Sequence, residues 1–336
     1  MPINTRSTLK TESTSLMAVH RPNKFRIFLR SEGAAFYGFI SLWLLGIFFL
    51  LIFPVVVAVI ISFTNFNGIT IPDTIFTGFS NYIEVFQSPD AWYTMGQTLL
   101  YSILVIPLSL GVALGLALLL NQKVPGKGLF RTAFYLPTII PIGAAALIFK
   151  SILDSNSGFL NLLISIFRPG TAINWINEYG LYALVAIGVW GCGVALVVFF
   201  AGLQEIPQEL EEAAAIDGAG KWQTFQHITW PLLSPITYFQ LVLGVINSLQ
   251  MFVPANIMSL TSDATTYWTP QHTLYMFPGY AMNQMMAAQR FGYGVSLIWI
   301  LFLLALAITL IIRKSSQFWV YYAIDQEGGN AQNEKA

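Results

Sequence analysis

The chain has 336 residues, of which 55% are hydrophobic and only 10% are charged, and its 16 Lys and Arg residues balance its 16 Asp and Glu residues. Soluble globular proteins carry about 25% charged residues, so the composition excludes an ordinary soluble domain, and the zero net charge argues against a nucleic-acid binder, which needs a basic face. One cysteine and three scattered histidines exclude a disulfide framework and offer no metal-ligand cluster, which leaves an integral membrane protein as the predicted class.

Six stretches of the sequence contain no charged residue, and each is long enough to hold a helix that crosses a membrane. They are residues 33–72, 91–122, 132–149, 179–204, 222–262 and 291–312. Crossing about 30 Å of hydrocarbon takes roughly 20 helical residues. We therefore place six spans at about 36–63, 97–120, 133–152, 182–203, 232–252 and 292–312.

The predicted fold class is an all-α membrane protein with six transmembrane helices. Strands of a membrane β-barrel alternate apolar and polar residues over about ten positions, whereas residues 188–202 and 297–312 are apolar on all sides. The first apolar stretch also exceeds the roughly 7–15 residues of a signal-peptide core. It is therefore expected to remain in the mature protein as the first span.

The distribution of basic residues predicts the orientation in the membrane. With the N-terminus inside, thirteen of the sixteen Lys and Arg residues lie on the cytoplasmic side, and only Lys150, Arg168 and Arg290 lie outside. Such a bias is typical of cytoplasmic loops, and an even number of spans returns the C-terminus to the cytoplasm. We expect a cytoplasmic tail at 1–33, a transmembrane domain at 34–314 and a second cytoplasmic tail at 315–336.

The predicted cytoplasmic loop 204–230 carries the signals of a short helix. Pro207 favours a helix start, where its missing N–H costs nothing, and three glutamates follow in the first turns, where negative charge favours the helix dipole. Residues 213–215 are alanines, which have high helix propensity. Gly218 is expected to end the helix in the left-handed conformation.

The second half of this loop has a different pattern. Trp222, Phe225 and Ile228 recur every three residues and form an apolar stripe that suits the membrane face. Pro231 is expected to begin the fifth span. The loop therefore presents a short helix with small side chains below the bilayer, suited to docking in a cleft of another protein.

Residues 212–231 resemble the signature loop of the binding-protein-dependent ABC importer permeases. In that family Glu-Ala-Ala is followed after three residues by Gly and, nine residues later, by Ile-x-Leu-Pro. The chain departs once, with Trp230 in place of Leu, and adds the frequent Asp217. The alternative interpretation is a generic solvated loop that contains a good helix former. The matching residues are Glu212, Ala213, Ala214, Gly218, Ile228 and Pro231.

The resemblance extends over most of residues 36–322 and points to the sugar-type branch. Within it the chain is similar to the first, maltose/glycerol-phosphate-type, transmembrane subunit. Gly158 and Asn161 belong to the part that resembles the third span. A departure follows the fifth span, where the family usually has a Gly-Gly-Pro turn and this chain has Ser-Asp-Ala-Thr-Thr at 262–266.

The resemblance implies a type I ABC importer permease in a bacterial plasma membrane. Its partners would be an extracytoplasmic solute-binding protein, a second permease subunit and the two nucleotide-binding domains of ABC ATPase subunits, in contact with the loop around Glu212 and Gly218. No GxxxxGK[ST] phosphate loop occurs in the chain. ATP and Mg²⁺ would therefore bind the partner ATPase, and this chain would hold no cofactor, metal or catalytic residue.

Polar and aromatic residues within the spans are candidates for the substrate path, because polar groups at membrane depth face the bundle or a cavity. Asn247 and Gln250 are three residues apart and share a helix face, where they could bind sugar hydroxyls beside a stacking aromatic ring. Hydrogen bonding between helices is the alternative for these amides, and packing is the alternative for Trp190, which lies beside Gly191 and Gly193. The candidates are Asn247, Ser248, Gln250, Phe252, Tyr238 and Trp190.

Three function classes compete on this evidence. The first is an ABC importer, either for a sugar or for a polyol or glycerol phosphate. The second is an ion-coupled secondary transporter, which usually places ionisable residues at membrane depth, and the six windows hold no Asp, Glu, Lys or Arg. The third is an intramembrane enzyme, which needs a nucleophile–base or metal constellation that the sequence lacks. The importer is therefore the predicted function, with membrane lipid around it and no nucleic-acid partner.

Overall fold

The computed structural model describes residues 32–122, 125–259 and 272–321. Within these ranges every regular element is a helix, and the only bridge of β type joins Thr64 to Phe76. The predicted all-α class is therefore confirmed for the described chain. Most of the two expected tails, and the departure at 262–266, lie outside the described residues.

The chain forms two compact units, Met1–Val57 and Ala58–Ala336. The first unit contains α2 (Glu32–Ile47), the π-helical turn η1 (Phe48–Ile52) and the start of α3 (Phe53–Ser62). The second unit holds the remaining helices: α4 (Ser80–Gln87), α5 (Pro89–Asn121), α6 (Lys127–Ile139), α7 (Ile142–Ile152), α8 (Phe159–Phe167), α9 (Trp175–Trp190), α10 (Gly193–Glu205), α11 (Gln208–Ile216), α12 (Lys221–Thr224), η2 (Phe225–Thr229), α13 (Trp230–Leu249), α14 (Val253–Ser259), η4 (His272–Leu274), α15 (Phe277–Met286) and α16 (Phe291–Ser316).

A wide turn marks the middle of the first candidate span, Phe36–Ser62. In η1 the N–H of Phe53 reaches back five residues to the carbonyl oxygen of Phe48. Pro54 follows directly, and its ring would clash with the carbonyl four residues earlier in a regular helix, so the π turn makes room for it. The most apolar window of this span has no buried residue, as expected of a helix that lipid or another subunit covers.

Four helices of the described chain are long and apolar enough to cross a membrane, and two bent helix pairs bring the number to six if each pair is one span. The bent pairs are α6 with α7 and α9 with α10. Each of these segments overlaps one of the six predicted windows. The four long helices are Phe36–Ser62, Pro89–Asn121, Lys221–Ser259 and Phe291–Ser316.

The expectation of one helix at 133–152 is wrong, because the chain turns sharply in the middle of it. Ile140 is extended, with ψ 125°, and it precedes Pro141, whose ring disfavours the helical conformation in the preceding residue. As a result α6 and α7 meet at 97°. The 13 residues of α6 span only about 20 Å, less than the roughly 30 Å of a bilayer core.

The fourth span is bent by 40° between α9 and α10. Gly191 and Cys192 form the break, and Gly193 begins α10. A Cβ atom on Gly193 would lie 2.7 Å from the carbonyl oxygen of Phe134 and 2.8 Å from Cγ2 of Thr138. The backbones of α10 and α6 therefore touch at a position that only glycine allows, which is a common device in packed membrane helices.

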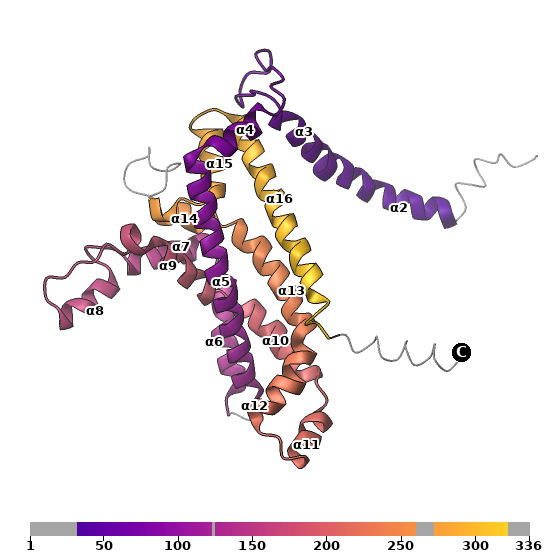
Figure 1. The fold of residues 1–336 in the computed structure, drawn as a ribbon, viewed down its shortest axis with the longest axis vertical. Helices are drawn as coiled ribbons and strands as arrows, with labels where there is room; N and C mark the ends of the chain where they lie inside the picture. The colour runs from indigo at the N-terminus through magenta and orange to yellow at the C-terminus, as the bar shows by residue number, and fades with distance from the viewer. Residues whose placement is uncertain (1–31, 123–124, 260–271, 322–336) are drawn as a thin grey trace, which may run out of the picture. The chain divides into compact units, whose positions relative to one another are not determined.

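Within the second unit α5, α10, α13 and α16 run side by side, with α11 and α12 beyond one end of α5 and α4 and α15 at its other end (Figure 1). The buried residues near α11 form what we term the loop-side core. On α5 this core contains small side chains: Ala113 and Ala117 are fully buried and let α10 approach closely. Its members are Ala113, Ala117, Leu120, Leu196, Phe199, Phe200, Leu203 and Leu233.

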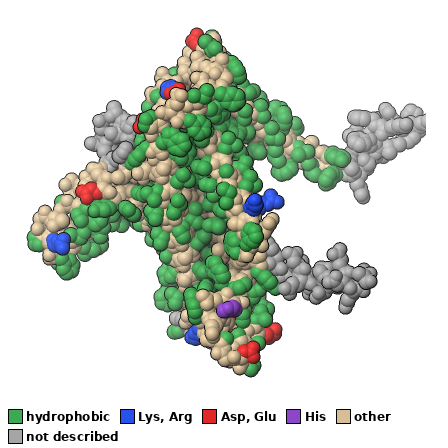
Figure 2. All heavy atoms as spheres, viewed as in Figure 1, with side chains coloured by type: hydrophobic (Ala, Val, Ile, Leu, Met, Phe, Trp, Pro, Cys, Tyr) green, Lys and Arg blue, Asp and Glu red, His purple; other side chains and the backbone are tan. Residues whose placement is uncertain are grey.

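Hydrophobic side chains are spread over the whole visible surface, and charged groups are few (Figure 2). Among the exposed side chains are Leu303 and Leu310 on α16, each more than half exposed in the chain taken alone. Monomeric soluble proteins rarely expose apolar surface of this extent, so this surface requires hydrocarbon or partner helices around it.

Candidate functional site

The candidate site is the loop 204–230, which begins where α10 ends. Ile206 and Pro207 are both extended, with ψ 121° and 130°. Ile206 takes this conformation because it precedes a proline, and the pair turns the chain into α11. The sequence pattern suggested that Pro207 is the first helical residue of α11. In the structure Pro207 is the N-cap residue, and the helix begins one residue later, at Gln208.

Helix α11 is an exposed acidic helix. Glu209 and Glu211 lie in its first turn, where they favour the positive end of the helix dipole. Glu212 and Ala213 are exposed, while Ala214 is half-buried. Residues 204–230 together carry five carboxylates against the one ammonium group of Lys221, which leaves four net negative charges with His227 neutral.

The C-terminus of α11 has the hydrogen bonds of a Schellman motif. The N–H of Ala219 donates to the carbonyl of Ala214 at 2.9 Å, and the N–H of Gly218 donates to the carbonyl of Ala215 at 3.2 Å. Gly218 has φ +81°, so the left-handed end predicted from the sequence is confirmed. Asp217 is the C-cap residue, and its N–H bonds to the carbonyl of Ala213 at 3.0 Å. These bonds satisfy the last carbonyl groups of the helix.

The chain then turns into a second helix that continues into the fifth span. The Oε1 atom of Gln223 accepts the N–H of Gly220 at 2.9 Å and so fixes the start of α12. The rings of Trp222 and Phe225 are stacked, with centroids 5.5 Å apart. Ile228, the third member of the predicted apolar stripe, is half-buried. Trp222 is exposed, as expected of an indole at a membrane surface.

The expectation that Pro231 begins the fifth span is wrong, because α12, η2 and α13 follow one another without a break from Lys221 to Leu249. The π turn η2 precedes Pro231 in the same way that η1 precedes Pro54, with the N–H of Trp230 bonded to the carbonyl of Phe225. Pro235 removes the N–H that would have bonded to the carbonyl of Pro231. The hydroxyl of Ser234 donates to that carbonyl at 2.6 Å instead.

A rigid support lies directly behind the loop. The loop-side core joins α5, α10 and α13, and the segment that follows α16 is attached to α13: the backbone N–H of Tyr321 donates to Oγ of Ser234 at 2.8 Å. Ser234 is fully buried, so its hydroxyl serves both partners in a position shielded from water. The loop therefore projects from a fixed base.

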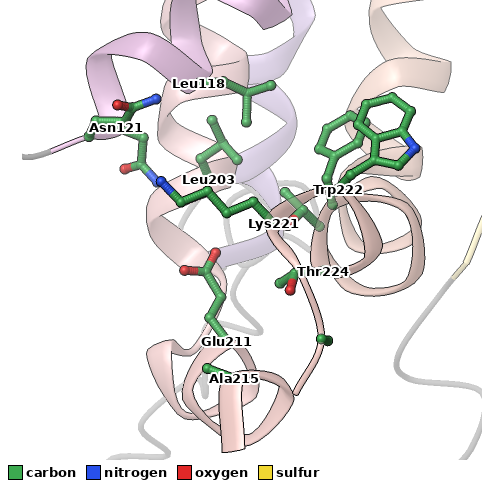
Figure 3. A pocket seen from close by; sticks show the side chains of 12 residues that line it. Leu118, Asn121, Leu203, Glu211, Ala215, Lys221, Trp222 and Thr224 are labelled. Atoms are coloured by element: carbon green, nitrogen blue, oxygen red, sulfur yellow. The ribbon is translucent and has the colours of Figure 1, made fainter. Parts of the chain in front are cut away.

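A cavity of about 880 Å³ separates α11 from the ends of α5 and α10 (Figure 3). In Figure 3 the side chain of Lys221 crosses this cavity toward Asn121 at the end of α5, while Glu211 points into it from α11. Its lining is half apolar, with Leu118 and Leu203 behind the polar groups. The cavity leaves α11 in contact with the bundle mainly through its two ends.

Ile216, the last residue of α11, is a site residue that the sequence analysis missed. It is 86% exposed, although the surrounding loop is polar and acidic. An exposed isoleucine on an acidic helix is the kind of anchor that fills a pocket in a partner protein. The sequence did contain a signal for this site: Ile216 is an aliphatic residue between small and acidic residues of the loop, which offer no apolar side chains to bury it.

The structure does not gather the six candidates for the substrate path in one place. Trp190 packs edge-on against Phe149, with ring centroids 5.6 Å apart, and Tyr238 packs against Trp319 at 6.3 Å. The hydroxyl of Ser248 is buried and donates to the carbonyl of Val245 at 3.1 Å. These three side chains are engaged in packing or in local hydrogen bonds.

The amides at the end of α13 are more accessible. Asn247 and Gln250 are both exposed, and Phe252 is half-buried. Gln250 lines a cavity of about 590 Å³ between α13, α15 and α16, in which Thr309 supplies a second polar group. Asn247 is not among the residues that line this cavity. The two amides therefore do not converge on this cavity, although they lie three residues apart at the end of α13.

The described residues contain no group of three or more His, Cys, Asp or Glu side chains that could hold a metal ion. The arrangement of the loop suits docking: an acidic helix with an apolar tip and fixed ends projects from a packed base.

Comparison with known proteins identifies the family. Residues 106–326 match the family described as "Binding-protein-dependent transport system inner membrane component". The chain is 33% identical over 302 residues to the probable ABC transporter permease protein YesP of Bacillus subtilis (strain 168), over 89% of this chain and 96% of that protein.

Two further matches agree with this assignment. The arabinooligosaccharides transport system permease protein AraP of the same organism is 29% identical over 290 residues, 85% of this chain and 90% of that protein. A chain of the bacterial alginate ABC transporter, crystallised with an alginate pentasaccharide-bound periplasmic protein, has a similar fold, with a TM-score of 0.69 and 21% identity over 87% of this chain and 96% of that chain. The protein is therefore a member of the binding-protein-dependent transport system inner membrane components, the permease subunits of ABC transporters.

Proposed function

We propose that this chain is one of two permease subunits of an ATP-driven sugar importer, and that loop 204–230 docks to the ATPase subunit. The observation that carries the proposal is α11, an exposed acidic helix held at both ends on a packed base. Four net negative charges on the loop favour a partner groove with basic residues. The exposed Ile216 would fill an apolar pocket in that groove. Glu212, Ala213 and Asp217 would face the partner from the same helix.

The structure suggests how docking would be transmitted to the substrate. The helix that begins at Lys221, directly after Gly218 and Ala219, continues without a break through α13. Its far end carries Asn247 and Gln250, and Gln250 lines the 590 Å³ cavity. A displacement of α11 by the closing ATPase would therefore move one wall of that cavity. Two arrangements of the bundle, biased by ATP and by the loaded binding protein, would give alternating access.

The proposed orientation places both termini and loop 204–230 in the cytoplasm of a bacterial cell. Thirteen basic residues on that side against three on the other support it. ATP and Mg²⁺ would bind the partner ATPase, since this sequence contains no GxxxxGK[ST] loop. The second permease subunit and lipid would cover the exposed apolar helix faces, and an extracytoplasmic binding protein would deliver the solute.

The proposed cargo is a carbohydrate. AraP is named for arabinooligosaccharide transport, and the solved alginate transporter binds a pentasaccharide through its periplasmic protein. Amide groups such as those of Asn247 and Gln250 pair with sugar hydroxyls both as donors and as acceptors. Their accessible position at the end of α13 supports this role.

Replacing the amides at the end of α13 tests the proposed cargo and path. We expect Asn247→Ala and Gln250→Ala each to lower ATP-dependent uptake of labelled oligosaccharide at least fivefold, because a polar contact to the solute is lost, while the ATPase still copurifies. Uptake is measured in cells that carry the remaining importer subunits and lack the chromosomal copy of this gene. Gln87→Ala is the matched control, since Gln87 is an exposed glutamine at the end of α4.

Three outcomes would contradict parts of the proposal. Unchanged uptake in both variants would make these amides part of the helix packing. Uptake of a polyol or glycerol phosphate, and of no oligosaccharide, would replace the cargo. Uptake that follows an ion gradient and continues without ATP would identify a secondary transporter instead.

A further inference from the structure

Helix α8 is a short helix with an exposed apolar face. Its nine residues carry no charge, and Phe159, Leu162 and Ile166 recur at the three- and four-residue spacing that places them on one face. Each of the three is about 60% exposed or more, and Phe167 is 85% exposed. A face of this kind in contact with water would be costly, at about 25 cal/mol per Å² of apolar surface.

A buried amide fixes the orientation of this helix. Asn161 is 6% exposed, and its Nδ2 atom donates to the carbonyls of Ser155 and Ile173 at 3.0 and 2.9 Å. Its Oδ1 atom accepts the indole N–H of Trp175 at 2.9 Å. The amide thus ties α8 to the chain on both of its sides. The apolar face is therefore held outward and is not free to rotate inward.

The polar groups of this segment lie at the two ends of α8. Before it, the carboxylate of Asp154 accepts the backbone N–H and hydroxyl of Ser157 and the N–H of Asn156. These hydrogen bonds, with that from the Ser157 N–H the strongest, lower the pKa of the Asp154 carboxyl, so it stays ionised at neutral pH. After the helix, Arg168 is exposed. A charge-free apolar face is thus flanked by charged ends.

An apolar groove lies beside α8, and Leu160 is the residue of α8 that lines it. Helices α7, α8 and α9 enclose a groove of about 400 Å³, lined almost entirely by apolar groups that include Phe149, Ile152 and Leu160. Tyr179 and Tyr182 line its other wall, and aromatic residues of this type gather at membrane–water boundaries. Because α7 leaves α6 at 97°, α7 would run along a membrane that α6 enters, and α8 packs against α7.

We propose that α8 is an interfacial helix that inserts its apolar face into the phospholipid bilayer, with Arg168 at the lipid phosphates. Lipid fits this face better than the soluble binding protein does. A surface that binds and releases a soluble partner is about as polar as the rest of a protein surface, whereas the exposed face of α8 has no charged group. The groove would hold an acyl chain. The proposal concerns membrane contact and does not depend on the cargo.

The test places environment-sensitive labels on α8 in the assembled complex. In a Cys192→Ser background, Leu162→Cys and Ile166→Cys carry an NBD fluorophore on the apolar face, and Asn156→Cys carries it in the exposed polar turn as the matched control. The complex is reconstituted in nanodiscs, with and without phospholipids that bear a nitroxide on the acyl chain. We expect the lipid nitroxide to quench the labels at 162 and 166 by at least half, and iodide in the buffer to quench mainly the label at 156.

Each other outcome overturns the proposal. Strong iodide quenching at 162 and 166 would mean that water contacts this face. Protection from both quenchers would mean that a protein covers it, and protection that appears only on addition of the binding protein would identify that protein as the partner. To check Arg168, quenching of the label at position 166 by the lipid nitroxide is compared between Arg168→Glu and the native chain, in nanodiscs that contain anionic phospholipid. We expect weaker quenching at position 166 in Arg168→Glu, and equal quenching would remove Arg168 from the proposal.

Discussion

Gly218→Val is expected to abolish solute-stimulated ATP hydrolysis by the reconstituted importer, with a decrease of at least tenfold. Gly218 has φ +81°, a conformation that costs an L-residue about 1–2 kcal/mol and a β-branched one more. The bonds from Ala219 to Ala214 and from Gly218 to Ala215 depend on this conformation. Without them the end of α11 would unwind, and the direction of α11 relative to α12 would no longer be fixed. The hydrolysis rate is measured in proteoliposomes with saturating loaded binding protein.

Gly220→Val is the matched control for this prediction. Gly220 lies two residues away and has φ −73° and ψ 161°, which any residue adopts. The nearest atom to an added Cβ is Oε1 of Gln223 at 3.8 Å. We expect this variant to keep at least half of the native hydrolysis rate. Equal rates in the native chain and in Gly218→Val would show that the left-handed end of α11 has no part in coupling.

Gly193→Val is expected to prevent correct packing of the bundle. A side chain at position 193 would collide with the carbonyl oxygen of Phe134 and with Cα of Tyr135, at 2.7 and 3.2 Å from the Cβ atom. These are backbone atoms, so α6 must move away from α10, and such overpacking typically costs about 1–3 kcal/mol. We expect a lower yield of monodisperse protein and an unfolding midpoint lower by several degrees, measured by fluorescence-detected size-exclusion chromatography after heating.

Gly191→Val tests whether the close contact, and not the loss of a glycine near the bend, explains this effect. Gly191 has φ −81°, and an added Cβ would meet the carbonyl oxygen of Ile187 at 3.5 Å, an ordinary contact distance. This variant should behave as the native protein. An unfolding midpoint that is unchanged in Gly193→Val would contradict the close approach of α6 and α10.

Local signals in the sequence predicted the helical class and the end of α11. They did not predict where a helix bends or where it continues through a proline. Gly218 ends α11 as expected because a left-handed helix end is decided by residues within one turn. The bend at Ile140 was missed because hydropathy is the same for a straight span and a broken one. The start of the fifth helix was misplaced for a related reason: a π turn accommodates Pro231 without ending the helix.

The candidate site shows the same limit. The acidic helix and its C-terminal end follow from sequence patterns, whereas Ile216 became a candidate only when its exposure was known. Tyr238 was a candidate for the substrate path because aromatic rings can stack on sugars, and Trp190 was a second candidate, for which packing beside two glycines was the alternative. Their contacts with Trp319 and Phe149 depend on distant parts of the chain, which a local pattern cannot reveal.

Copurification of the ATPase with variants of α11 tests the central claim most directly. Ile216→Asp places a charge on the exposed apolar tip of α11, and Gln208→Asp places the same charge in the first turn, where it favours the helix dipole. Both positions are exposed, so neither change should affect folding. We predict that the native chain and Gln208→Asp recover the ATPase from detergent-solubilised membranes in equal amounts, and that Ile216→Asp recovers less than one tenth. Equal recovery with Ile216→Asp would contradict docking through α11.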